Sequence, residues 1–235
     1  MTRYLLIIIG LISSLSCKQN DSVSTIVDIG RLDRIGIARQ LSIIQKYSPK
    51  VIGLDLLLTT DSLDKDILLA KEILRSKNIV QASTLHEFIE QQNYWDSLEL
   101  FHEKFQNDNF GFSNITITAD SVFVHELPMI QYYRQKTIYS LSYVVANNSF
   151  GVKQKYKQNG DKDFYFDKTS IGRQFKIISV NDLLTGKFDK KDLKDKIVLL
   201  GHVSDKEDSF YLDDRRTKRI SGVEIHASII RQLIE

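Results

Sequence analysis

Two short apolar runs, separated by a segment with helical periodicity, restrict the fold of this chain more than any other feature. Residues 25–29 form a β-branched run, and residues 51–58 are almost continuously apolar. An apolar run of this kind is typical of a strand that helices cover on both faces of a sheet. Between the runs, residues 32–47 carry apolar side chains at helical spacing, and Pro49 then ends the helix. The order strand, helix, buried strand predicts two parallel strands joined by a right-handed crossover.

The remainder of the chain continues this alternation. The patterns predict further helices at residues 64–75, 137–147, 181–185 and 223–234, and further strands at residues 78–82, 164–166, 175–180 and 197–200. Residues 85–105 hold aromatic and charged side chains at mixed spacing, and we expect a helix there that breaks near Asn93. At Asn114 the apolar period changes to alternation, which indicates an antiparallel hairpin turning at residues 119–121. Residues 151–160 are basic and polar and predict a loop.

Together these elements predict a single α/β domain over residues 25–235. We expect three layers: a mixed, mostly parallel sheet with helices on both faces, and an antiparallel hairpin inserted midway. A chain of 235 residues can bury a sizeable core, and with only Pro49 and Pro128 no proline-rich linker divides it. The formal net charge of +2 gives no reason to expect nucleic acid as a partner.

The first residues have the features of a segment that directs export. Arg3 is followed by an apolar or small run over residues 4–16, and then by Cys17, the only cysteine of the chain. A helix of that length spans roughly 20 Å, less than the roughly 30 Å hydrocarbon core of a bilayer. The run therefore predicts a signal peptide over residues 1–16. It resembles a bacterial lipoprotein signal, which implies that Cys17 is lipidated and that residues 17–24 form a tether. The alternative is an uncleaved anchor in which Cys17 is an ordinary apolar residue.

Several segments follow one another in an informative order. They are Ile26-Val-Asp-Ile29, Pro49-Lys-Val-Ile-Gly-Leu-Asp55, Gly111-Phe112, Val124-His-Glu-Leu-Pro128, Phe175-Lys-Ile-Ile-Ser-Val-Asn-Asp-Leu-Leu-Thr-Gly186, Leu193-Lys-Asp-Lys-Ile-Val-Leu-Leu-Gly201 and Ser221-Gly-Val-Glu-Ile-His-Ala-Ser228. In this order they resemble the type-two CHASE domain, an extracytoplasmic sensory module of bacterial signalling proteins. The resemblance spans residues 25–235.

The resemblance implies a non-enzymatic module, without a cofactor, that binds an unknown small-molecule or ionic stimulus. Binding would shift a conformational equilibrium that a partner protein, or a second copy of the chain in a homodimer, reads. With lipid on Cys17, the module would be membrane-anchored outside the cytoplasm.

Polar side chains at the predicted strand ends suggest where a ligand binds. In open α/β sheets, ligands bind outside the carboxyl ends of the strands. We expect a cavity for a small cationic or polar ligand, or for a divalent ion, formed by Asp28, Asp55, His202, Asp205, Asp208, Glu224 and His226. Two alternatives in which these residues have purely structural roles stay open. Asp55 could accept hydrogen bonds from loop amides and only organise a turn, and His226 could be a partly buried structural histidine.

The motifs that would indicate metal binding or catalysis are missing from the sequence. Glu224 and His226 are two residues apart and do not share a helix face. His202, Asp205 and Asp208 could supply imidazole and carboxylates to a divalent ion, but they match no dedicated metal motif, so we expect no dedicated metal site. Neither a Gly-x-Ser-x-Gly elbow nor a glycine-rich phosphate loop occurs. Two other classes of function remain open: a periplasmic hydrolase that uses His202, Asp205 and Asp208, and an interaction scaffold without a ligand.

Overall fold

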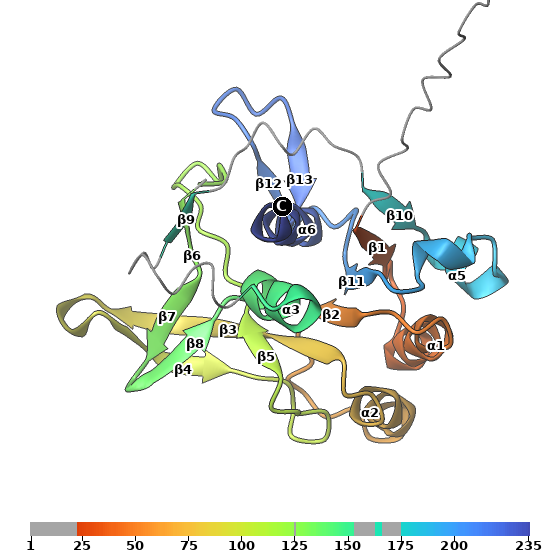
Figure 1. Ribbon diagram of the computed structural model, residues 1–235. Coiled ribbons are helices and arrows are strands. Elements are labelled where there is room, and N and C mark those ends of the chain that lie inside the picture. The colour runs from red at the N-terminus through yellow and green to blue at the C-terminus, as the bar shows by residue number, and fades with distance from the viewer. Residues whose placement is uncertain (1–22, 125, 153–162, 166–174) are drawn as a thin grey trace, which may run out of the picture.

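The computed structural model describes residues 23–124, 126–152, 163–165 and 175–235. Within these residues, nine strands form one sheet in the order β10-β1-β11-β2-β3-β4-β7-β8, with β5 paired to β3 (Figure 1). The strands of this sheet are β1 (Ser24–Asp28), β2 (Val51–Asp55), β3 (Ile79–Ile89), β4 (Tyr94–Glu99), β5 (Phe110–Phe112), β7 (Ile130–Tyr133), β8 (Lys136–Tyr139), β10 (Lys176–Ile178) and β11 (Ile197–Gly201). Two antiparallel pairs lie outside it: β12 (Ser209–Tyr211) with β13 (Arg219–Ser221), and β6 (Glu126–Pro128) with β9 (Asp163–Tyr165).

Helices cover both faces of the parallel half of the sheet. On one face, α1 (Arg34–Gln45) packs against α2 (Asp66–Leu74) and α5 (Val180–Thr185). On the other face, α3 (Leu141–Phe150) packs against α6 (Gly222–Ile234), which also contacts β1 and β11 (Figure 1). Short 3-10 turns lie at Leu63–Lys65, Glu90–Gln92 and Lys190–Asp192. The three-layer α/β fold with a mixed, mostly parallel sheet is therefore confirmed.

The side chains of the central strands point alternately to the two faces of the sheet and pack into two separate hydrophobic cores. Leu199 of β11 points into the core beneath α3 and α6, whereas Leu200 points into the core beneath α1 and α2. Gly53 of β2 faces the first core, where an added Cβ would lie 2.6 Å from Leu199 and 3.1 Å from Val145 of α3. Because these strands are buried on both faces, nearly all their residues are apolar, and the sequence shows unbroken apolar runs there.

The expectation of a helix over residues 85–105 is wrong. These residues form the second half of β3, a turn at Glu90–Gln92, and β4, which pairs antiparallel with β3. Cross-strand pairs such as Leu85 with Leu98 and Phe88 with Trp95 use the apolar side chains that suggested a helix. Asn93, where we expected a break, adopts a left-handed conformation and closes the hairpin. Side-chain pairing between strands outweighed local helix propensity.

The helix expected over residues 137–147 is only partly correct. The chain is extended up to Tyr139 in β8, and α3 begins at Leu141. Ser140 separates them, because its hydroxyl accepts a hydrogen bond from the amide of Tyr143 and so caps α3.

The hairpin expected after Asn114 is present as a narrow ladder. Ile117 and Phe123 form an antiparallel bridge, and the amide of Thr118 donates to the carbonyl of Val122 over 2.9 Å. The other expected helices and strands occur within a few residues of their predicted bounds, but β2 ends at Asp55 rather than at residue 58, and β3 continues to Ile89 rather than ending at residue 82.

Some expectations fall outside the described residues. These are the signal peptide, Cys17, most of the tether and most of the loop at residues 151–160. In the part of the chain that the structure describes, no helix is both long and apolar enough to cross a membrane.

Candidate functional site

Three adjacent parallel strands end in register at one edge of the sheet. Asp28 of β1 pairs with Gly201 of β11, and Gly201 pairs with Asp55 of β2. A Cβ on Gly201 would lie 3.0 Å from Val223 and 3.2 Å from the Cβ of Asp55, so the small residue lets α6 approach the strand ends. Two carboxyl groups thus flank one glycine at the carboxyl edge, directly before His202.

Asp28 organises the loops at this edge. Its Oδ1 accepts hydrogen bonds from the amides of Gly30 (3.1 Å) and Val203 (3.2 Å). Its backbone carbonyl accepts a hydrogen bond from the side chain of Gln40 in α1 over 2.9 Å. Asp28 therefore has the turn-organising role that the sequence analysis considered for Asp55.

Asp55 instead lies in a buried cluster with His226 and Ser142. Its Oδ1 lies 3.8 Å from Nε2 of His226, whose Nδ1 is 2.8 Å from the Ser142 hydroxyl. Oδ2 of Asp55 is buried and has no hydrogen-bond partner among the described residues. The Asp55 side chain is 11% exposed and that of His226 is 4% exposed. A buried carboxyl oxygen without a donor is costly in the charged form.

Burial controls the protonation of this pair. It raises the pKa of Asp55 to about 7, against a lowering by the charge of nearby His202. It lowers the pKa of His226 to about 4, against the opposing effects of Asp208 and of a hydrogen bond with the Ser113 backbone. At neutral pH His226 is therefore uncharged, whereas Asp55 keeps its proton to a much higher pH than an exposed carboxyl group does.

Asp208 brings a second carboxyl group to the cluster from the loop after β11. Burial, and then the negative charge of Asp55, raise the pKa of Asp208 to about 6. The carboxylate lies against the first residue of α6, since a Cβ on Gly222 would be 2.6 Å from its Oδ1. The Gly222 amide also donates to the Asp208 carbonyl over 3.1 Å. Asp208 therefore couples the loop to the start of α6.

Two cavities open at the same edge, on either side of the loop that follows His202. The larger, of about 490 Å³, is lined by Asp28, Gly30, Arg31, His202, Ser204, Asp205, Lys206 and Glu207. The smaller, of about 200 Å³, is lined by Val203, Ser204, Asp205, Lys206, Ser209, Arg219, Ile220, Ser221 and Glu224. Residues 204–206 line both cavities, so a ligand in either one would contact this loop.

The remaining two expected site residues make local hydrogen bonds. Glu224 accepts from the amide (3.0 Å) and the hydroxyl (2.8 Å) of Ser221 and so caps α6. Asp205 accepts from the amide of Glu207 over 3.0 Å. Both side chains still line a cavity wall.

The structure thus divides the expected site residues into two cavities and a buried cluster rather than a single cavity. Sequence reasoning missed Ser142, which lies 84 residues before His226 and reaches it only because α3 packs against α6. No local motif marks this serine. Among the described residues, no group of three or more His, Cys, Asp or Glu side chains could hold a metal ion.

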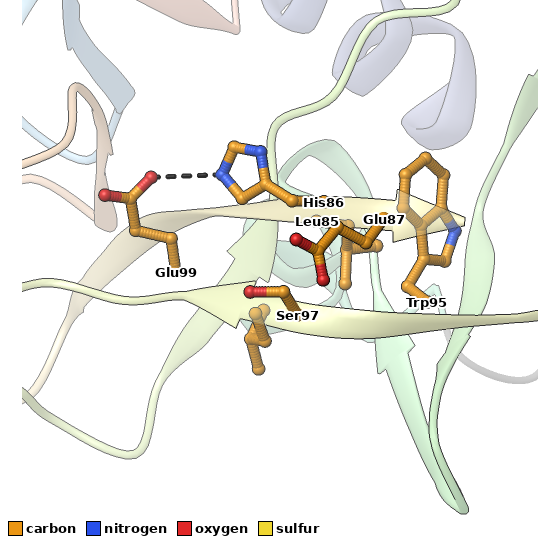
Figure 2. A pocket seen from close by; sticks show the side chains of 7 residues that line it. Leu85, His86, Glu87, Trp95, Ser97 and Glu99 are labelled. Carbon is orange, nitrogen blue, oxygen red and sulfur yellow. Dashed lines mark hydrogen bonds and ion pairs between the residues drawn. The ribbon is translucent and has the colours of Figure 1, made fainter. Parts of the chain in front are cut away.

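Another hollow of the described surface lies away from this edge, on the β3–β4 hairpin. It is an open groove of about 850 Å³, and Figure 2 shows His86 pointing to Glu99 across the two strands, with Glu87 and Trp95 further along. Nε2 of His86 is 3.1 Å from Oε2 of Glu99, and both side chains are more than two-fifths exposed. Because solvent reaches these groups, their charges need no ligand. The buried groups at the carboxyl edge are the stronger candidates for a functional site.

Comparison with known proteins yields one match. The model of a family described as the CHASE2 domain matches residues 19–235, which include every residue that the structure describes. No curated protein and no solved structure matches the chain.

Proposed function

This chain belongs to the CHASE2 domain family, a family of extracytoplasmic sensory domains, and we propose that it is a non-enzymatic, ligand-binding sensor held at a membrane by lipid on Cys17. The observation that carries the proposal is the buried pair of Asp55 and His226, with the half-buried Asp208 next to it, beside a loop that lines two cavities. Binding at the loop changes the electrostatic surroundings of titratable groups that are shielded from water, so a small local contact has a large effect on their ionisation.

The chemistry of the larger cavity favours a small cationic or polar ligand. Asp28, Asp205 and Glu207 line it together with Arg31 and Lys206. His202, also in its wall, interacts electrostatically with Asp55 and Asp208. A bound cation favours the ionised form of both carboxyl groups, so its binding releases protons and strengthens as the pH rises from 5 to 8.

A thermal-shift screen of small amines, amino acids and divalent ions tests ligand binding. At a concentration 100 times its Kd, a ligand should add roughly 2.7 kcal/mol to the free energy of unfolding. The variant Asp205→Asn should lose most of this gain, whereas the matched variant Glu99→Gln, in the hairpin groove, should keep it. A screen without any shift would favour the scaffold without a ligand.

A hydrolase is the rival that one contact favours, since Ser142, His226 and Asp55 follow one another like a nucleophile, a base and an acid. However, Ser142 is 1% exposed and lines neither cavity at the carboxyl edge. Its hydroxyl oxygen is therefore poorly placed to meet a substrate carbonyl from solvent. We expect no turnover with a panel of esters and amides. Turnover that Ser142→Ala abolishes, without loss of the folded state, would contradict the proposal.

The membrane anchor is tested separately. Cells fed an alkyne analogue of a fatty acid should label the protein, and Cys17→Ala should abolish the label and release the protein from the membrane fraction. Because one acyl chain anchors only marginally, several chains on Cys17 are needed for stable attachment. A labelled Cys17→Ala protein would overturn this part of the proposal.

A further inference from the structure

Helix α2 exposes an unusual amount of apolar surface. Ile67, Leu68 and Leu74 are 68%, 50% and 56% exposed, although Leu69 and Ile73 of the same helix are fully buried. Ion pairing of Asp66 with Arg34 of α1 holds the helix in this orientation. The outward face is therefore fixed, and its apolar side chains cannot turn inward.

Charges of opposite sign lie on either side of the apolar pair Ile67 and Leu68. Asp64, in the 3-10 turn that leads into α2, lies three residues before Ile67, and Lys71 lies three residues after Leu68. Both are exposed. Residues three and four apart share a helix face, so these four side chains form one outward stripe. We name Asp64, Ile67, Leu68 and Lys71 the α2 stripe.

We propose that the α2 stripe is the contact between two copies of this chain, which pair as antiparallel helices about a two-fold axis. In such a contact the same patch serves both copies. With the axis between Ile67 and Leu68, these residues of one copy meet Leu68 and Ile67 of the other. Asp64 of each copy then meets Lys71 of its partner at both ends of the contact. The stripe is complementary in charge to its own reverse.

The size of the stripe sets the strength of this contact. A single pair of short helices buries much less than the roughly 1,200 Å² at the lower end of stable interfaces. The dimer is therefore weak in solution, with an expected dissociation constant of about 0.1 to 1 mM. Tethering both copies to one membrane raises their effective concentration and stabilises the pair. Only this last step rests on the proposed lipid anchor.

Disulfide trapping tests the geometry in a Cys17→Ser full-length chain, which has no other cysteine. Leu68→Cys should form a disulfide-linked dimer under mild oxidation, because the two thiols lie beside the axis. Leu74→Cys is the matched control, since it is similarly exposed but lies about 20 Å from its symmetry mate along the helix. A disulfide bridges Cα atoms no more than about 7 Å apart. Equal trapping at both positions, or none at Leu68→Cys, overturns the proposal.

Charge reversal tests the partner. Sedimentation of concentrated protein should show that Asp64→Lys and Lys71→Asp each abolish the dimer and that the double variant restores it. An anionic lipid surface is the other possible occupant of a basic-flanked apolar helix. In that case the single variant Asp64→Lys would increase binding to phosphatidylglycerol vesicles and the double variant would rescue nothing, which would overturn the dimer. All these positions are exposed, so circular dichroism should show unchanged folding.

Discussion

Asp28 and Asp55 occupy equivalent places, at the ends of two parallel strands beside the same glycine, yet their surroundings differ. Asp28 accepts hydrogen bonds from two loop amides. Asp55 has a buried oxygen without a donor among the described residues and a pKa raised to about 7. Hydrogen bonds to a carboxylate favour its charged form, and burial without them disfavours it. Asp28 therefore stabilises the fold, whereas Asp55 can take up or release a proton near neutral pH.

Asp55→Asn should stabilise the folded chain in a pH-dependent way. The folded pKa lies above the unfolded value, so the folded state holds the proton more tightly, and the contribution of Asp55 to stability is lost as the pH rises from about 4 through about 7. The gain from Asn should be largest at pH 8, with an upper bound of roughly 4 kcal/mol, and should vanish toward pH 4. Urea unfolding at both pH values measures it. The exposed control Asp64→Asn should change little, and a gain independent of pH would contradict the assignment.

His226 has the opposite pH dependence. Its folded pKa of about 4 lies below the usual value, so its contribution to stability is lost as the pH falls from 6.5 toward 4. This loss occurs in both the parent and the Asp55→Asn chain. The comparison between the two chains therefore reports mainly on Asp55.

At the scale of elements, β3 joins two halves of the molecule. One is the parallel half around β1, β2 and β11, and the other is the hairpin half, which contains β4, β7 and β8. The first residues of β3 pair in parallel with β2 and β5, and its second half pairs antiparallel with β4. The β7–β8 hairpin then extends the sheet beyond β4. Directly after β8, Ser140 starts α3, the helix that brings Ser142 to His226. The position of this helix start therefore determines part of the buried cluster.

Replacing the serine that caps α3 should destabilise the fold. Ser140→Ala removes the acceptor for the Tyr143 amide, and loss of such a cap costs roughly 0.5–2 kcal/mol. Chemical denaturation should show a lower midpoint with an unchanged slope. Thr137→Ala, at an exposed position of β8, serves as the control and should have a smaller effect. Equal effects of the two substitutions would mean that the cap contributes nothing.

At the scale of the whole molecule, two cores share one set of strands. The central strands contribute alternate side chains to the core under α3 and α6 and to the core under α1 and α2. A smaller cluster around Leu85, Phe112 and Ile138 lies under the hairpin half. Loss of a central strand would expose both large cores at once, so the molecule should unfold as one unit.

Two probes can test this cooperativity. Trp95, the only tryptophan, lies in β4 and reports on the hairpin half, whereas far-ultraviolet circular dichroism reports mainly on the helices of the other half. Because β3 runs through both halves, the two urea transitions should coincide. An earlier transition of the Trp95 fluorescence would show that the hairpin half unfolds independently.

The sequence alone determined the parallel half of the fold. The apolar runs of β2 and β11 and the amphipathic pattern of α6 are local signals, because burial on two faces, or on one stripe, leaves a distinct periodicity. The carboxyl edge was predictable for the same reason, since parallel strands end together. Asp28, Asp55 and His202 could be placed there without any coordinates.

Only the tertiary structure decided the rest. Residues 85–89 and 94–99 form strands because β3 and β4 pair with each other, a long-range gain that outweighs a weak local preference. The contact between Ser142 and His226 exists only after α3 packs on α6. The protonation of Asp55 depends on how completely neighbouring elements exclude water and which amides reach it. Such distances and burial arise from the packing of distant segments, and a local pattern of residues does not contain them.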